Sequence, residues 1–170
     1  MSAPSIRIEP LAGYAPTIGR LVGMLTYARQ MTLLAVKDLT TDQLDHLQDE
    51  KSNSIGALLA HDAAVERVYQ LLTFEERQPS DSEQAELAAG LELGDKGRKL
   101  LRGKPLGHYL EALAAIRQRT LEELATRDDA WLEQPMKRIP NMNAHWAWFH
   151  VAEDEINHRG QIRWLRARLP

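Results

Sequence analysis

The C-terminal segment, residues 145–170, contains a helical stripe in which two members are not ordinary core residues. Stepped by four or three positions, so that they share one helix face, its members are Ala147, Val151, Asp154, His158, Ile162 and Leu165. A buried carboxylate without a partner is costly, so such groups normally pair, lose their charge or bind a metal. Asp154 and His158 are four residues apart and can direct two ligand atoms at one ion. His150 lies one turn earlier and extends the row.

A third candidate ligand lies in an earlier stripe. In SIGALLAHDAAVERVYQLL, residues 54–72, the apolar face carries Leu58, His61, Val65, Val68 and Leu72. A single histidine on such a face is more often a core residue bonded to a neighbour, but the second histidine-bearing helix favours a ligand. Asp62 would either orient a ligand or be exposed, and we expect it to be exposed. The resulting hypothesis is a site built from His61 and the Asp154–His158 pair.

A metal with an open coordination position can lower the pKa of a bound water or thiol and present it as a nucleophile. His150, Glu153 and Glu155 are candidate general bases, and His150 is the best placed because it shares the row. The non-catalytic alternative is a buried hydrogen-bond network, with or without a structural ion, in a bundle that dimerises or binds a small ligand. The spacing alone does not decide between the two hypotheses.

Apolar residues at helical spacing predict four long helices, near 16–39, 52–73, 105–127 and 143–168. Ser52 or Ser54 can cap the second helix, Pro105 suits the first turn of the third, and Asn141 or Asn143 can cap the fourth. A polar, Gly-rich crossover, residues 74–104, joins the second and third helices, with at most short helical turns near 83–89 and 97–101. No strand pattern is convincing, and residues 127–143 read as a loop over one end. We therefore predict an all-α four-helix bundle and a single domain over residues 1–170.

The composition excludes several classes of protein. A charged fraction of 26%, a mean hydropathy of -0.42 and the lack of a long uncharged apolar run argue against a membrane span. A net charge of -3 gives no general reason to bind nucleic acid. The absence of cysteine excludes disulfides and a thiolate nucleophile of the chain's own. The opening MSAPSIRIEP lacks the apolar core of a secretory signal, so we expect a cytoplasmic location.

The remaining histidines and the aromatic residues of the last segment have other expected roles. His145 falls on a different face from the row, and His108 has no visible partner and is expected on the surface. The aromatic residues of the terminal helix, which would serve a homodimer interface or, for about half of them, the core, are Trp146, Trp148, Phe149 and Trp164.

The segments SIGALLAHDAAVERVY and HVAEDEINHRGQI together resemble the DinB/YfiT-like superfamily of bacterial four-helix bundles, over nearly the whole chain. In that family one histidine of the second helix and two of the last hold a divalent metal. The resemblance implies His61, Asp154 and His158 as the metal ligands here, with Asp154 where histidine is commoner. A carboxylate is a competent ligand for zinc, nickel, iron or manganese, although it adds negative charge to the site.

The same resemblance implies an activity and partners. Relatives transfer low-molecular-weight thiols to small electrophiles or hydrolyse small substrates, with a divalent metal, and often form homodimers. The lack of cysteine is compatible with a thiol that arrives as a cosubstrate. The resemblance therefore implies a metal-dependent enzyme with a small-molecule substrate. From the charge and hydropathy given above, we expect no nucleic-acid or membrane partner.

Overall fold

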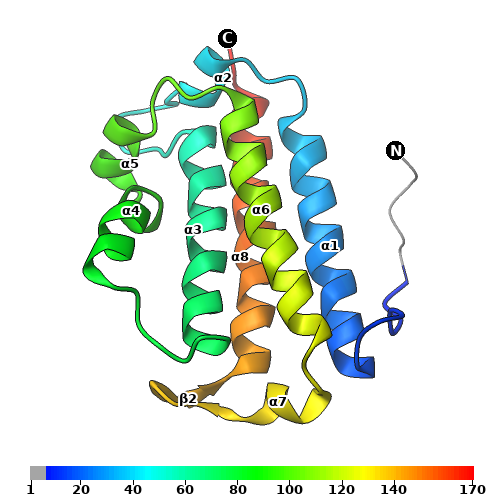
Figure 1. Ribbon diagram of the computed structural model, residues 1–170. Helices are drawn as coiled ribbons and strands as arrows, with labels where there is room; N and C mark the ends of the chain where they lie inside the picture. The colour runs from blue at the N-terminus through cyan, green and yellow to red at the C-terminus, as the bar shows by residue number, and fades with distance from the viewer. Residues whose placement is uncertain (1–6) are drawn as a thin grey trace.

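A computed structural model describes residues 7–170, and four long helices stand side by side in it (Figure 1). They are α1 (Pro16–Val36), α3 (Ile55–Thr73), α6 (Leu106–Ala125) and α8 (Ala144–Arg166). The predicted all-α bundle is confirmed, and each predicted helix end lies within about three residues of the observed one. That residues 1–170 form one domain stays a prediction, and residues 1–6 of the opening stretch lie outside the described residues.

Side chains at the helix starts account for several of these boundaries. The Ser54 hydroxyl accepts a hydrogen bond from the Ala57 amide at 3.2 Å, and the Asn143 carboxamide accepts one from the Trp146 amide at 2.8 Å. Ser54 and Asn143, rather than Ser52 and Asn141, are thus the caps of α3 and α8. No described helix is long and apolar enough to cross a membrane.

The segment between α6 and α8 is more regular than predicted. It forms α7 (Asp129–Glu133) and an antiparallel pair of strands, β1 (Pro135–Met136) and β2 (Ile139–Asn143), beneath the bundle (Figure 1). The prediction of no strand was therefore wrong for this segment. Met136 and Ile139 pack against Leu72 and Ala147, and a pairing this short is fixed by that packing rather than by a strand-length pattern.

The crossover is also more helical than predicted. It contains α4 (Asp81–Glu92) and α5 (Gly94–Leu100), which lie outside α3 in Figure 1, whereas α2 (Thr41–Asp45) lies at the opposite end from β2. Ser80 and Glu83 form a reciprocal capping box that starts α4. A Cβ added at Gly90 would lie 2.8 Å from the Ala60 carbonyl oxygen of α3. Glycine at this position therefore allows α4 to approach α3 closely.

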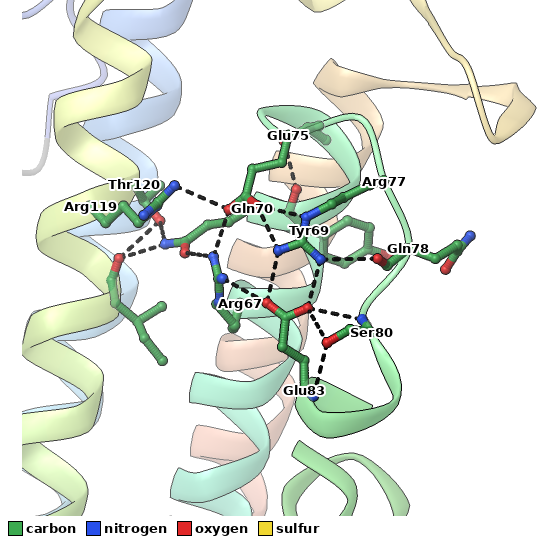
Figure 2. Close-up of polar contacts among 12 residues, drawn as sticks. Arg67, Tyr69, Gln70, Glu75, Arg77, Gln78, Ser80, Glu83, Arg119 and Thr120 are labelled. Atoms are coloured by element: carbon green, nitrogen blue, oxygen red, sulfur yellow. Dashed lines mark hydrogen bonds and ion pairs between the residues drawn. The ribbon is translucent and has the colours of Figure 1, made fainter. Parts of the chain in front are cut away.

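An ion-pair network ties the start of α4 to α3 (Figure 2). Arg67 of α3 contacts Glu75 at 3.1 Å and Glu83 at 3.2 Å, and Arg77 donates to Glu83 at 2.6 Å. Pairs of this kind, partly exposed to solvent, contribute little individually, but a network of several shared charges holds one arrangement better than an isolated pair. The network therefore fixes where α4 begins along α3.

Four charged side chains, one from each long helix, meet inside the bundle. Arg29 of α1 contacts Glu66 of α3 at 3.0 Å and Glu155 of α8 at 2.8 Å. Arg117 of α6 contacts Glu66 at 2.7 Å and Glu155 at 3.1 Å. Thr120 also donates to Glu66, at 2.7 Å.

The network is electrically neutral and its hydrogen bonds extend to the backbone. Glu66 is 0% exposed and Glu155 is 1% exposed, so each carboxylate depends on both arginines for compensation. The arginines also donate to main-chain carbonyls, Arg29 to Leu113 at 2.6 Å and Arg117 to Leu25 at 2.7 Å. Because its members come from all four helices, the network fixes the position of α3 relative to α8.

Candidate metal centre

His61 of α3 meets Asp154 and His158 of α8 at one point. One ligand atom from each residue can be chosen so that all three lie within 4.8 Å of one another. His61 Nε2 is 3.3 Å from Asp154 Oδ2, which is about the spacing of two ligand atoms that sit 2.0–2.2 Å from one tetrahedral ion. The two imidazole rings meet edge to face, with centroids 4.7 Å apart. The three residues singled out from the sequence are therefore neighbours in space.

Each histidine makes a hydrogen bond through Nδ1, and His158 Nδ1 also lies 3.7 Å from Asp154 Oδ2. His61 Nδ1 lies 2.9 Å from the Gly90 carbonyl oxygen, and His158 Nδ1 lies 2.8 Å from Asp62 Oδ1. An acceptor at Nδ1 favours the tautomer in which Nδ1 carries the proton and donates, which leaves Nε2 as the basic nitrogen. Metal-binding histidines commonly have this arrangement, with a carbonyl or a carboxylate behind the ring. Two such imidazoles and one carboxylate fit a divalent ion with open positions.

Asp62 is buried, contrary to the expectation from the sequence. It is 5% exposed, and it bonds to His158 on α8 rather than to its neighbour His61. Adjacent residues on a helix point about 100° apart, so Asp62 contacts α8 while His61 lies between α8 and the crossover. Asp62 Oδ2 has no hydrogen-bond partner among the described residues.

Burial and charge act in opposite directions on the three central groups. Burial lowers the pKa of His61, but the hydrogen bonds to Asp154 and Gly90 and the nearby carboxylates outweigh it and raise the pKa. Burial raises the pKa of Asp154, but the hydrogen bond from His61 and the charges of the neighbouring histidines lower it below 3.8. The carboxylate of Asp154 therefore stays charged at neutral pH and is available as a metal ligand.

Burial raises the pKa of Asp62 to about 6, although the hydrogen bond from His158 acts to lower it. The charge of Glu155 adds to the rise. A carboxylate that holds an imidazole in this way makes the ligating nitrogen more basic.

A cavity of about 290 Å³ opens beside Asp154. Its wall is mostly apolar, with polar groups at His61, Asp154, His150 and Tyr69, and its apolar members are Val65, Val68, Leu72, Leu91, Ile139 and Met142. Val65 and Val68 are only half-buried, so the stripe predicted for the core on α3 serves in part as this wall. Burial raises the pKa of Tyr69, and the Asp154 charge raises it further, so the phenol keeps its proton.

The three candidate bases fall in different environments. His150 lines the cavity, lies with Nδ1 3.1 Å from the accepting carboxylate oxygen of Glu153, and stacks on Trp146 with ring centroids 4.8 Å apart. Glu155 lies in the buried ion network and has no access to the cavity. Glu153 is half-exposed and lines a different groove, between α1 and α8. Of the three candidate bases, His150 is the one that lines the cavity together with His61 and Asp154.

The other predicted residues are also placed. His108 is exposed, as expected, and His145 lies away from the cluster with Nδ1 3.4 Å from Glu133. Trp148 is fully buried, whereas Trp146, Phe149 and Trp164 are exposed.

Sequence reasoning missed the contribution of the crossover. Gly90 supplies the acceptor for His61 and Leu91 supplies part of the cavity wall. The only signal was the pair of alanines before a glycine in a helical stretch, which is too general to indicate contact with α3.

A comparison with models of protein families shows to which family the chain belongs. The family model described as Mycothiol-S-transferase matches residues 20–170. The chain belongs to this family. The family lies within the DinB/YfiT-like superfamily, whose members generally bind a divalent metal, and the earlier resemblance is confirmed. No individual curated protein sequence matches the chain.

Proposed function

We propose that the protein is a metal-dependent S-transferase that joins a low-molecular-weight thiol of the mycothiol class to a small electrophile. The observation that carries the proposal is the convergence of His61, Asp154 and His158, with both imidazoles held at Nδ1, beside a cavity. The family relationship supports the thiol, because the matching family is named for mycothiol transfer. The chain has no cysteine, so the sulfur must come from a cosubstrate.

We assign the metal ligands to His61 Nε2, a carboxylate oxygen of Asp154 and His158 Nε2. When bound, a zinc, nickel, iron or manganese ion would lower the pKa of a thiol at its open position towards neutrality. Gly90 and Asp62 hold the two imidazoles, and Asp62 adds negative charge behind His158. This negative charge and that of Asp154 balance a divalent cation.

His150 is the residue that would take the thiol proton. Its Nδ1 is engaged by Glu153, and its ring is held by stacking on Trp146, so Nε2 is its free basic nitrogen. The sulfur electron pair then forms a bond to the electrophilic carbon, and the leaving group departs with its own electron pair. Where the electrophile is a double bond, the proton returns to the neighbouring carbon instead.

The cavity beside Asp154 suits the electrophile. A volume of about 290 Å³ with apolar walls favours a small, uncharged and largely apolar molecule. Tyr69, which keeps its proton, can donate a hydrogen bond to an oxygen of such a substrate.

The test is a transfer assay with the zinc-loaded, full-length protein, mycothiol and 1-chloro-2,4-dinitrobenzene as the apolar electrophile, followed by absorbance of the conjugate. We expect turnover that chelation abolishes and that His150→Ala lowers by about 10²–10⁴-fold without loss of metal. Loaded protein that transfers nothing to this or to a panel of other electrophiles would favour the non-catalytic alternative.

We further propose a homodimer in the cytoplasm. An apolar groove of about 470 Å³ between α1 and α8 is lined by Tyr27, Phe149 and Ile156, which are exposed in the single chain. A second copy would cover this face about a two-fold axis. The cytoplasm keeps thiols reduced, as the proposed cosubstrate requires. Sedimentation of a monomer at micromolar concentration would refute the dimer.

A further inference from the structure

The helix α4 forms one wall of the cavity beside Asp154 and also touches the ligand cluster. Leu91, in its last turn, lines the cavity, and the Gly90 carbonyl oxygen lies 2.9 Å from His61 Nδ1. The other residues that line the cavity belong to α3, β2 and α8. A movement of α4 would therefore change the shape of the cavity and the support of His61 at the same time.

The attachment of α4 to the bundle involves few buried groups. Among the residues of α4, all of which the structure describes, Gly90 alone is buried, and the others are exposed or half-buried. The helix lies beside α3 at the edge of the molecule (Figure 1). Its start is tied down by Arg67 and Arg77, which both contact Glu83 (Figure 2). Segments that bury little apolar surface open locally at low cost, so the second half of α4 is one of the least stable parts of the fold.

The backbone is strained at Leu93, the residue that joins α4 to α5. Its φ is 49° and its ψ is -149°, a combination that glycine adopts readily and that a bulky side chain disfavours. A residue keeps such a conformation only where its surroundings hold it, and conformations of this kind are frequent at ligand clamps and switch regions. Leu93 can relax only if one of the two helices that it joins moves.

The chain on the α5 side of Leu93 is firmly attached. The Gly94 amide donates a hydrogen bond to Asn53 Oδ1, in the segment before α3, at 3.0 Å. The Leu101 carbonyl oxygen, directly after α5, accepts one from the Tyr109 hydroxyl of α6 at 2.6 Å. Because α5 is fixed at both ends, a relaxation at Leu93 moves α4 and leaves α5 in place.

We propose that α4 is a movable wall of the electrophile cavity, hinged at Leu93, and that Leu91 on this wall selects the electrophile by size. When α4 lifts, Leu91 leaves the cavity and a molecule can enter. When α4 closes, Leu91 contacts that molecule and the Gly90 carbonyl oxygen returns to His61. This role of Leu91 rests on the proposed function, which places the electrophile in the cavity.

The selection follows from what closure accomplishes. A molecule small enough to leave room for Leu91 allows α4 to close, which excludes water and restores the hydrogen bond to His61. A larger molecule holds α4 open, so that His61 loses its acceptor and the site stays hydrated. Binding energy is then used to complete the site only for the smaller substrate.

Hydrogen–deuterium exchange of the full chain without any ligand tests the hinge. Glycine adopts the backbone conformation of Leu93 without strain, so Leu93→Gly should keep α4 closed and slow the exchange of amides 82–92 by about tenfold. Leu100→Gly is the matched control, because it makes the same replacement at a helical position of α5 and should leave the exchange of α4 unchanged. Unchanged exchange of α4 in Leu93→Gly would overturn the hinge.

The size selection is tested with 1,3-dinitrobenzene and the larger 1,3-dinitronaphthalene, which have no leaving group and bind without reaction. Quenching of tryptophan fluorescence in the zinc-loaded full chain measures both affinities. Leu91→Ala shortens the side chain on the wall, so we expect the affinity for the larger probe to rise by about tenfold relative to that for the smaller. Leu100→Ala, at an exposed leucine that does not line the cavity, should keep the ratio of the parent. The same ratio in Leu91→Ala as in the parent would overturn the role of Leu91.

These measurements separate the movable wall from the proposed function, because neither needs turnover. If Leu93→Gly and Leu91→Ala behave as expected but the zinc-loaded parent transfers no thiol, the transfer proposal fails and the movable wall stands. If the parent transfers thiol while both variants match it in exchange and in probe ratio, the movable wall is overturned and the transfer proposal stands.

Discussion

Asp62 Oδ1 lies 2.8 Å from His158 Nδ1, although the two residues are 96 positions apart in the chain. The bond crosses from α3 to α8, and it places a buried carboxylate against the imidazole of His158. Asp62 is therefore a positioning residue for His158. Its effect on metal binding can be tested without changing any of the three proposed ligands.

The Asp62→Asn variant keeps the size of the side chain and an acceptor oxygen but removes the charge behind His158. We expect its affinity for zinc to fall by about 10–100-fold, as is typical when such a supporting carboxylate is lost. Competition with a chromophoric chelator measures the affinity, and Asp42→Asn, at an exposed position on α2, is the control. Unchanged affinity in Asp62→Asn would mean that Asp62 does not orient a ligand.

Gly90 connects the crossover to the site. In Gly90→Ala the added Cβ would lie 2.8 Å from the Ala60 carbonyl oxygen and 2.9 Å from Ala64 Cβ, so α4 must move away from α3. We expect a loss of about 1–3 kcal/mol in the free energy of unfolding, together with weaker zinc binding as the acceptor leaves His61. Denaturant titration measures the first effect and chelator competition the second.

Gly107→Ala is the matched control for this variant. Gly107 is an exposed glycine in α6, and a Cβ there would meet nothing within 4 Å. Alanine favours the helix over glycine, so we expect a gain of up to about 1 kcal/mol and unchanged zinc binding. If Gly90→Ala behaved as Gly107→Ala does, the close approach of α4 would have no role in the site.

The buried ion network predicts a dependence of stability on pH. Burial alone would raise the pKa of Glu66, but the charges and hydrogen bonds of Arg117 and Arg29 outweigh it and lower the pKa from its ordinary value of 4.5. A carboxylate with a lowered folded pKa stabilises the fold above its unfolded value, and this contribution is lost as the pH falls below about 4.5 through the folded pKa. The free energy of unfolding should therefore fall in this range.

Glu66→Gln tests the origin of that dependence. The variant leaves two buried arginines with one carboxylate, so we expect a loss of about 3–5 kcal/mol at neutral pH and a shallower fall below pH 4.5. Chemical denaturation at several pH values measures both. Glu86→Gln, at an exposed position of α4, should change the free energy of unfolding by no more than about 0.5 kcal/mol. An equal slope in parent and Glu66→Gln would assign the acid sensitivity to other groups.

The fold was largely predictable, because helix periodicity and capping residues are local signals. The proximity of His61 to the Asp154–His158 pair was also predictable, since charged or imidazole groups on apolar stripes must find partners. Which face of α3 packs against the other helices was not predictable. That face carries Asp62 and Glu66, and acidic residues are typical of an exposed face. Only the arginines on apolar stripes, Arg29 and Arg117, hinted that these acids are buried.

The hairpin and the crossover escaped prediction for a different reason. The two strands are too short for a period-two pattern, and the approach of α4 to α3 depends on a contact between segments about thirty residues apart. The stripe that contains His61 was assigned to the core, whereas part of it lines the cavity. Periodicity reports that a face is apolar, and it does not say whether protein or ligand covers it.

The metal content of reconstituted protein tests the central claim most directly. After zinc loading and desalting, elemental analysis should give about one ion per chain for the parent, His108→Ala and His145→Ala, and almost none for His61→Ala, Asp154→Ala and His158→Ala. Asp154→His should keep the ion and shift the preference towards metals that favour nitrogen ligands. If His150→Ala lost its zinc while Asp154→Ala kept it, His150 would be the third ligand. Equal zinc content in every folded variant would contradict the proposed site itself.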